Sequence, residues 1–475
     1  MRLQYVPRED PATYDMLCKA DSMGVFQVES RAQMAMLPRL RPRAFYDLVV
    51  EVALVRPGPI QGDMVHPYLK RRQRKEPVEP ISPAVDAVLA RTFGVPIFQE
   101  QVMQLAVVAA NFTPGEADQL RRAMAAWKRK GGLEPFEQKL RAGMAVNHLP
   151  AAFAERIIMQ IQGFGEYGFP ESHAASFALL VYASAWLKCH HPAAFLCGLL
   201  NSQPMGFYSP SLLIQDARRH GVKVLPPEVT ASDWESRIDA HGAVRLGLRE
   251  ISGLSRMVAE SITVNRQKQP FFDVADLAAR AGLQRRDLDL LAAADALSSL
   301  AGNRRQAAWA ATAAVVQGDL FDGLTLSEAA AALPAPSEAE NLIADYHSLG
   351  LSLRRHPLAL LRPQLSARRF VFAADLKTAA HCAAIRAAGI VVGRQRPGTA
   401  TGIVFVTLED ESGLTNVVVH PELVEKQRRE LLGASLLGVF GQLQKEGEVI
   451  HLVAKRLVDL SAWLGQLETS SRDFH

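Results

Sequence analysis

Thr113-Pro-Gly-Glu116-Ala-Asp-Gln-Leu-Arg121-Arg122 predicts a helix with a defined start and two adjacent cations. Threonine followed three residues later by glutamate is typical of a capping box, and proline is favoured at the first helical position. A second amphipathic helix is expected from Pro150 to Gln162, because its apolar residues recur on one face. We therefore expect the first 200 or so residues to be mainly helical.

The rest of the chain changes character twice. Residues 225–316 contain short elements typical of helix-hairpin-helix units, and a polar, alanine-rich linker follows. From Ala387, five short β-runs are separated by turn residues, which predicts a small barrel. The expected fold is multidomain and mainly α, with a carboxy-terminal β-barrel of the OB-fold type.

Composition excludes some classes of protein. The 475 residues carry a net charge of only +4, with local basic runs such as Lys70–Lys75. Such a run indicates a polyanion partner or, alternatively, a solvated charged loop. The longest mostly apolar run, Ala174–Leu187, is too short for a bilayer, and four cysteines show no disulfide or metal spacing. We expect a cytoplasmic protein without a membrane partner.

Three apparent sites are rejected. Gly163–Gly168 matches G-x-G-x-x-G, but a helix and not a strand precedes it, so we do not expect a dinucleotide fold. Cys189-His190-His191 with Cys197 lacks a second ligand pair at usable spacing for zinc. Asp287 and Asp289 fall on a predicted helix, where they diverge by about 200°. We therefore expect no two-metal site.

Five segments occur in an order that resembles the fingers of bacterial C-family DNA polymerases, the family of the DNA polymerase III alpha subunit. They are Gly24-Val-Phe-Gln-Val-Glu-Ser30-Arg31, Leu54-Val-Arg56-Pro-Gly-Pro-Ile-Gln61, Phe98-Gln-Glu-Gln-Val-Met103, Gly115–Met124 and Tyr167-Gly-Phe-Pro-Glu-Ser172-His173-Ala-Ala-Ser-Phe177. One such segment is weak, but five collinear ones are specific.

The resemblance implies a nucleotide site. Residues matching Arg121, Arg122, Tyr167 and His173 line the incoming-nucleotide site in the family, so we expect them to bind dNTP here. Paired arginines suit a triphosphate, and a helix amino terminus favours anions. Arg56 is a further candidate, although it equally fits a structural arginine that ties loops together.

The hairpin region implies DNA contact. Gly253, Leu254 and Ser255 fit a hairpin that points backbone N–H groups at a DNA phosphate, with serine at the second glycine position. Asp295 stands where related sequences usually have glycine, and an acid would repel phosphate. We therefore expect a second hairpin to be structural.

The remaining candidates lie further along the chain. Gln317, Leu320 and Phe321 resemble the short motif by which polymerases bind the sliding clamp, although a linker with an apolar contact fits as well. The barrel is similar to the family's OB-fold, in which Arg394, Arg396 and Phe405 are expected to bind single-stranded template; Phe405 also fits a core position.

Other features favour the error-prone branch of the family. Pro170-Glu171 departs from the Asn-Lys of replicative members, and the Arg394–Thr399 and Ser471–His475 stretches are similar to that branch. Lysine replaced by Glu171 removes a cation beside the nucleotide site, which we expect to loosen nucleotide selection.

The resemblance begins at about Val6, so we expect this carboxy-terminal half to lack the palm aspartates that bind Mg²⁺ and to be inactive alone. The expected function is an error-prone DNA-directed DNA polymerase for translesion synthesis and DNA repair, with primer-template DNA, dNTP, sliding clamp and repair proteins as partners. The alternative is a non-catalytic DNA-binding or scaffold module. The expected domains are fingers over 1–205, the hairpin region over 206–316, a linker with helices over 317–385, the barrel over 386–462 and a tail over 463–475.

Overall fold

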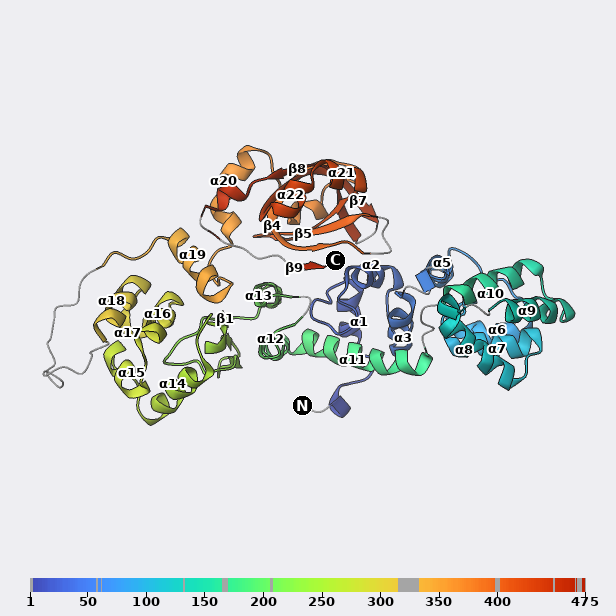
Figure 1. Cartoon of the computed structure of the whole chain (residues 1–475), viewed down its shortest axis with the longest axis horizontal. Helices are drawn as coiled ribbons and strands as arrows, with labels where there is room; N and C mark the ends of the chain where they lie inside the picture. Colours follow the sequence, from blue (N-terminus) through green and yellow to red (C-terminus); the bar gives the residue numbers. More distant parts are fainter. Residues whose placement is uncertain are drawn as a thin grey trace. The chain divides into compact units, whose positions relative to one another are not determined.

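The chain divides into two compact units, residues 1–191 and 192–475, which are described separately (Figure 1). The computed structural model describes residues 3–474 apart from 57–58, 61, 131–132, 165–169, 206–207, 315–332, 398–401, 447–448, 466 and 468–471, with backbone only for 125–130, 446 and 472–474.

The first unit contains a group of helices packed around α11 (Glu171–His190). The small buried residues Ala174, Ala178 and Ala185 allow its neighbours to approach closely. Its Tyr182 hydroxyl donates to the Pro7 carbonyl. Although α11 is apolar, none of the described helices is long and apolar enough to cross a membrane. The partners of α11 are α1 (Pro11–Cys18) and α3 (Phe45–Leu54), with α2 (Arg31–Leu40) packed on both of them.

A second helical group follows in the same unit. Gly143 of α9 (Glu134–Val146) lies against the backbone of α7 (Gln99–Ala110), where an added Cβ would meet the Ala110 carbonyl oxygen at 2.2 Å. Glycine therefore sets the separation of these two helices. The other helices are α5 (Val65–Arg72), α6 (Pro83–Leu89), α8 (Pro114–Lys130) and α10 (Ala151–Gly163). The predicted amphipathic helix over 150–162 is confirmed in α10, which buries Phe153, Ile157, Ile158 and Ile161.

The second unit begins with helices α12 (Pro192–Asn201) and α13 (Pro210–Arg219) and a three-stranded sheet. The sheet order is β1 (Val224–Leu225), β3 (Val244–Arg245), β2 (Arg237–Ile238), so β2 is an edge strand. The Asn201 side chain covers the backbone just before this edge: its Nδ2 donates to the Ser236 carbonyl and its Oδ1 accepts from the Ser236 N–H, both at 2.9 Å.

The tandem hairpins follow the sheet and share one apolar core. Leu254, Ile262, Leu277 and Leu288 are buried in it. The predicted helical position of Asp287 and Asp289 is confirmed in α16, where Asp289 pairs with Arg285. The helices are α14 (Arg256–Lys268), α15 (Val274–Ala281), α16 (Arg285–Ala293), α17 (Ser298–Ala301) and α18 (Arg304–Ala314).

Two helices follow the hairpins in the sequence and precede the barrel. They are α19 (Glu338–Leu349), which starts with a capping box formed by Ser337 and Glu340, and α20 (Pro357–Ala367). Leu349 packs against the hairpin core, whereas Leu358 and Leu365 are buried against the barrel.

The barrel has five main strands: β4 (Ala384–Gln395), β5 (Val404–Asp410), β6 (Gly413–Val419), β7 (Leu436–Glu446) and β8 (Val449–Asp459). β4 pairs with both β5 and β7, and β6 pairs parallel with β8, so the sheet closes on itself. Two short helices, α21 (Pro421–Lys426) and α22 (Arg428–Gly433), connect β6 to β7, and β9 (Arg472–Phe474) pairs with β4. The predicted mainly α architecture with a carboxy-terminal OB barrel is confirmed.

Candidate nucleic-acid interface

The two arginines of α8 lie side by side at the surface. The predicted capping box is present, because Glu116 accepts from the Thr113 N–H at 2.9 Å and the Thr113 hydroxyl accepts from the Glu116 N–H. The box fixes where α8 begins, and Arg121 and Arg122 follow on its second turn with side chains 39% and 74% exposed. Both guanidinium groups are therefore accessible to a ligand.

Asp118 holds both arginines. Its two oxygens lie 2.9 Å from Arg121 and 2.7 Å from Arg122. The hydrogen bond from Arg121 lowers the pKa of the Asp118 carboxyl, and the charge of Arg122 adds to the effect. The cluster therefore has two cations and one anion, and a phosphate has to compete with one exposed carboxylate.

His173 is exposed in the first turn of α11, which begins at Glu171 and therefore two residues earlier than a cap at Ser172 predicts. Its ring packs edge-on against Phe177, with 4.4 Å between centroids. The amino terminus of this helix already holds carboxylates of the chain, because Glu100 accepts from the Glu171 N–H at 3.0 Å. Glu171 itself accepts from the Tyr46 hydroxyl and pairs with Arg91. An anion bound at this helix end would therefore lie beside two carboxylates, those of Glu100 and Glu171.

Arg56 links two segments of the first unit. Its Nε donates to the Val52 carbonyl at 3.2 Å and its Nη2 to Gln27 Oε1 at 2.8 Å. These bonds favour the structural interpretation of Arg56 over the nucleotide-binding one.

The basic run over 70–75 is also used within the fold. Arg72 donates to Asp47 and to the Leu40 carbonyl, both at 2.6 Å. Arg71 donates to the Phe93 carbonyl at 3.0 Å. These two arginines therefore connect α5 to its neighbours. This structural role differs from both interpretations of the sequence, a polyanion partner and a solvated loop.

Four predicted residues lie outside the described part of the chain. Tyr167 falls within 165–169, and the clamp-motif residues Gln317, Leu320 and Phe321 fall within 315–332. Their roles stay predictions.

The first hairpin has the geometry that the sequence predicts. Gly253 has φ +81°, a conformation that glycine adopts without strain. Leu254 is buried in the hairpin core, and Ser255 caps α14 by accepting from the Val258 N–H at 3.3 Å. Gly253 and Ser255 are exposed at the amino end of α14, so a phosphate can approach their backbone.

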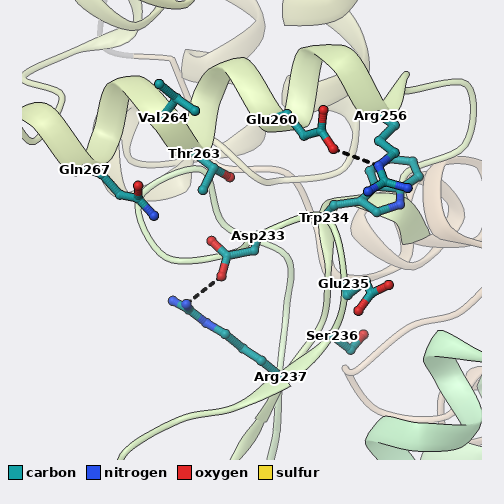
Figure 2. A pocket seen from close by; sticks show the side chains of 10 residues that line it. All are labelled: Asp233, Trp234, Glu235, Ser236, Arg237, Arg256, Glu260, Thr263, Val264 and Gln267. Atoms are coloured by element: carbon teal, nitrogen blue, oxygen red, sulfur yellow. Dashed lines mark hydrogen bonds and ion pairs between the residues drawn. The ribbon is translucent and has the colours of Figure 1, made fainter.

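A groove of about 490 Å³ runs along the side of α14 (Figure 2). Arg256, Glu260 and Thr263 line it from the helix, and Asp233 and Arg237 line it from the opposite segment. Each of the two arginines is paired inside the groove, Arg256 with Glu260 and Arg237 with Asp233. Because its three acids, Asp233, Glu235 and Glu260, outnumber its two arginines, the groove does not favour a polyanion.

The second hairpin places an acid in a left-handed turn. Asp295 has φ +60°, which explains why glycine suits this position. Its carboxylate pairs with Arg354 at 2.9 Å, and burial raises its pKa. This arrangement agrees with the expected structural role of the second hairpin.

The three residues of the barrel that were predicted to bind DNA differ in their exposure. Arg394 is only 6% exposed, and it donates to the carbonyls of Leu431 and Ala434 at 2.7 and 2.6 Å. Its guanidinium thus ties α22 to β4, and we leave it out of the proposed DNA interface. Arg396 is exposed at the end of β4. Phe405 is half-buried between the inward-facing Val404 and Val406, so it faces the outside of the barrel and is not a core residue.

Sequence reasoning missed the acids that accompany the cations. Asp118 is three and four residues before the two arginines, a spacing that favours ion pairs on a helix, so it was within reach of the sequence. The bond that Glu100 of α7 accepts from the start of α11 was not, because 71 residues separate the two bonded groups.

One group of possible metal ligands lies within the first unit. Atoms of Asp10, Cys189 and His190 come within 4.8 Å of one another. The Asp10 carboxylate already accepts from the Thr13 N–H, the Thr13 hydroxyl and His190 Nε2. It therefore serves as a helix cap and an ion pair, and it gives no support for zinc at Cys189 and His190.

Comparison with known proteins matches each of these parts. Residues 1–148 match the bacterial DNA polymerase III alpha subunit finger domain, 221–307 a helix-hairpin-helix motif and 385–460 an OB-fold nucleic acid binding domain. The whole chain is 82% identical over 476 residues to an error-prone DNA polymerase of Dechloromonas aromatica, of which it covers 46%. It is 64% identical over 491 residues to the error-prone DNA polymerase of an Azoarcus species, and 62% over 479 residues to that of Alkalilimnicola ehrlichii, covering all of this chain and 46% and 47% of those proteins.

The chain spans about half the length of the curated relatives it matches. The predicted resemblance to the error-prone branch is confirmed by these matches. By sequence, the chain is similar along its whole length to error-prone DNA polymerases, and its first 148 residues match the finger domain of the bacterial DNA polymerase III alpha subunit.

Proposed function

We propose that this chain provides the nucleotide- and DNA-handling surfaces of an error-prone DNA-directed DNA polymerase that acts in translesion synthesis and DNA repair in the cytoplasm. The similarity along the whole chain to error-prone DNA polymerases carries the proposal. The exposed arginine pair of α8 gives it a physical basis, because two adjacent guanidinium groups match the dense charge of a triphosphate.

The nucleotide is bound by Arg121, Arg122, His173 and Tyr167 in this proposal. DNA is bound by the first hairpin, through Gly253 and Ser255 beside the buried Leu254, and by Arg396 and Phe405 of the barrel. Hairpin N–H groups bind phosphate without reading sequence, and an outward aromatic ring stacks on bases of a single strand. Arg56 takes the structural role. The sliding clamp binds the segment with Gln317, Leu320 and Phe321.

Nucleotide transfer by the family requires divalent metal ions, which lower the charge on the triphosphate and activate the attacking oxygen. The carboxylates nearest the arginines do not fit this role. Glu116 is paired with Lys139, and Asp118 with Arg121 and Arg122. We therefore derive no step through Mg²⁺ and assign its ligands to another part of the complete enzyme.

A chimera tests the proposal. The matching part of the Dechloromonas aromatica enzyme is replaced by this chain, and primer extension is measured on undamaged and lesion-containing templates. We expect extension on both templates, with errors, because the two sequences are 82% identical. A chimera that binds primer-template but never extends it would favour the non-catalytic alternative.

A further inference from the structure

The carboxyl end of α19 contacts the first hairpin. The Ser252 N–H, next to Gly253, donates to the Ser348 carbonyl at 2.8 Å. Ser348 is only 9% exposed, and its neighbour Leu349 packs against the hairpin core. The contact is therefore part of a packed interface and not a chance approach.

A helix carboxyl end resembles a phosphate electrostatically. The last four carbonyls of a helix have no partner within the helix, and together they carry about half a negative charge. In α19 the Tyr346 carbonyl is satisfied by the Gly350 N–H, and the Ser348 carbonyl is satisfied by the hairpin. The hairpin thus binds, within the chain, the kind of acceptor that a DNA phosphate oxygen presents.

Ionic contacts hold the same segment on the hairpin region. Arg304 of α18 donates to Asp345 and to Asn341 of α19, and both charged side chains are at least nine-tenths buried. Beyond the helix, Arg354 pairs with Asp295 of the second hairpin at 2.9 Å and with Asp345 at 3.4 Å. One segment of the chain therefore contacts both hairpins.

We propose that the carboxyl end of α19 competes with a DNA phosphate at the first hairpin, because it takes the Ser252 N–H directly beside the exposed Gly253 and Ser255. The proposal rests on the proposed function, since it takes the first hairpin as a DNA contact. A phosphate that reaches Gly253 and Ser255 meets the partial negative charge of the α19 carboxyl end beside them, so DNA binds more tightly when α19 moves away, and a partner that draws α19 away would raise the affinity for DNA.

A reversible cross-link tests the competition. Ser252→Cys and Ser348→Cys are combined in a chain in which the exposed Cys382 is serine, since a backbone hydrogen bond joins the two positions. Binding of a fluorescein-labelled primer-template is measured before and after oxidation, with each single cysteine variant as control. We expect the affinity to fall at least threefold on oxidation and to recover with reductant.

Two results would overturn the proposal: equal affinity in the oxidised and reduced double variant, or no disulfide at all. The proposed function is checked separately with Ser255→Asp against Ser255→Asn. Both residues cap a helix, but only aspartate places a charge at the hairpin. Weaker binding by Ser255→Asp alone supports the hairpin as a DNA contact. Equal binding by both variants refutes that part of the proposed function, whatever the cross-link does.

Release of α19 gives the opposite result. Arg354→Ala removes one link between α19 and Asp295, and we expect about two- to fivefold tighter DNA binding, the range for a partly exposed ion pair. Arg355→Ala is the matched control, because it removes the same charge but only a pairing with Glu338 at the start of α19. Equal affinities of the two variants would contradict the competition.

Discussion

The arginine pair of α8 and the first hairpin are both proposed to bind phosphate, but they differ in how the chain's own groups already occupy them. Arg121 and Arg122 remain at the surface, where one exposed acid, Asp118, neutralises them in part. At the first hairpin, the N–H of the exposed Ser252 donates to the carbonyl of Ser348, which is only 9% exposed. If the two proposals hold, a ligand displaces a solvated ion pair at α8, whereas at the hairpin it competes with a packed helix.

The two sites therefore differ in the free energy that an anion needs to displace the groups of the chain that already occupy them. Exposed ion pairs contribute at most about 1 kcal/mol each, so they exchange readily for a better partner. The carbonyl of a buried residue such as Ser348 is costly to leave unsatisfied, so we expect α19 to leave the hairpin less readily than Asp118 leaves the arginines. We expect nucleotide binding to be immediate and hairpin binding to be conditional.

The largest effect is expected when the arginine pair is removed. In the chimera, Arg121→Ala with Arg122→Ala should lower kcat/KM for dNTP by about 100-fold or more, since each charge-assisted bond contributes about 1.5–3 kcal/mol. Primer-template affinity, measured by fluorescence anisotropy, should stay within about twofold. Arg141→Ala is the control, because Arg141 is similarly exposed and paired with Glu155. Equal loss of dNTP and DNA binding would place the arginines on the DNA backbone instead.

Buried charge can be measured through pH. Burial raises the pKa of Glu409 in the barrel to about 7, above its value in the unfolded chain. Between pH 4.5 and 7 the folded state holds the extra proton, so the free energy of unfolding falls as the pH rises. By pH 8 the loss from this group should be roughly 2–3 kcal/mol.

Urea unfolding of the wild-type chain and of Glu409→Gln at pH 5 and pH 8 isolates this contribution, because Glu29 and Glu51 also have raised pKa values and contribute equally to both proteins. The variant should lose less stability than the wild type over this interval. An identical loss would mean that Glu409 is already ionised in the folded barrel.

The acid between the arginines should have a smaller effect. Asp118→Asn removes the carboxylate that pairs with both guanidinium groups and leaves the two arginines exposed. We expect dNTP to bind about fivefold more tightly, from the loss of two competing surface ion pairs. Titration calorimetry with dNTP measures it. Weaker binding would show that Asp118 positions the arginines and does not compete with the ligand.

The smallest effect is expected at the second hairpin. In an Arg354→Ala background, where the pair with Arg354 is already lost, Asp295→Asn keeps a residue that tolerates a positive φ and removes a negative charge, so DNA affinity should rise by about a further twofold at low salt and less at high salt. Unchanged affinity at low salt would mean that DNA does not approach this hairpin.

Local sequence patterns predicted local structure well. The capping box of α8, the apolar face of α10 and the alternation of the barrel strands are each set by neighbouring residues, so they could be read from the sequence. The fold class followed from the same patterns, and the branch of the family followed from the resemblance.

Contacts between distant segments could not be predicted. Arg394 belongs to a basic stretch, yet it is buried because the carbonyls at the end of α22, about 40 residues later, accept its protons. Arg72 likewise belongs to a basic run but binds Asp47. A pattern reveals that a residue is charged, whereas the partner that satisfies the charge depends on the packing of other elements.

The Asn201 side chain has a consequence for how copies of the protein behave at high concentration. An exposed strand edge offers its N–H and C=O groups to the edge of another molecule, which is a common route to aggregation. The Asn201 side-chain amide bonds to both the N–H and the C=O of Ser236, as one peptide unit of a neighbouring strand would. Together with the Cys197 thiol, which donates to the same Ser236 carbonyl, this side chain withholds the backbone directly before β2 from the edge of another molecule.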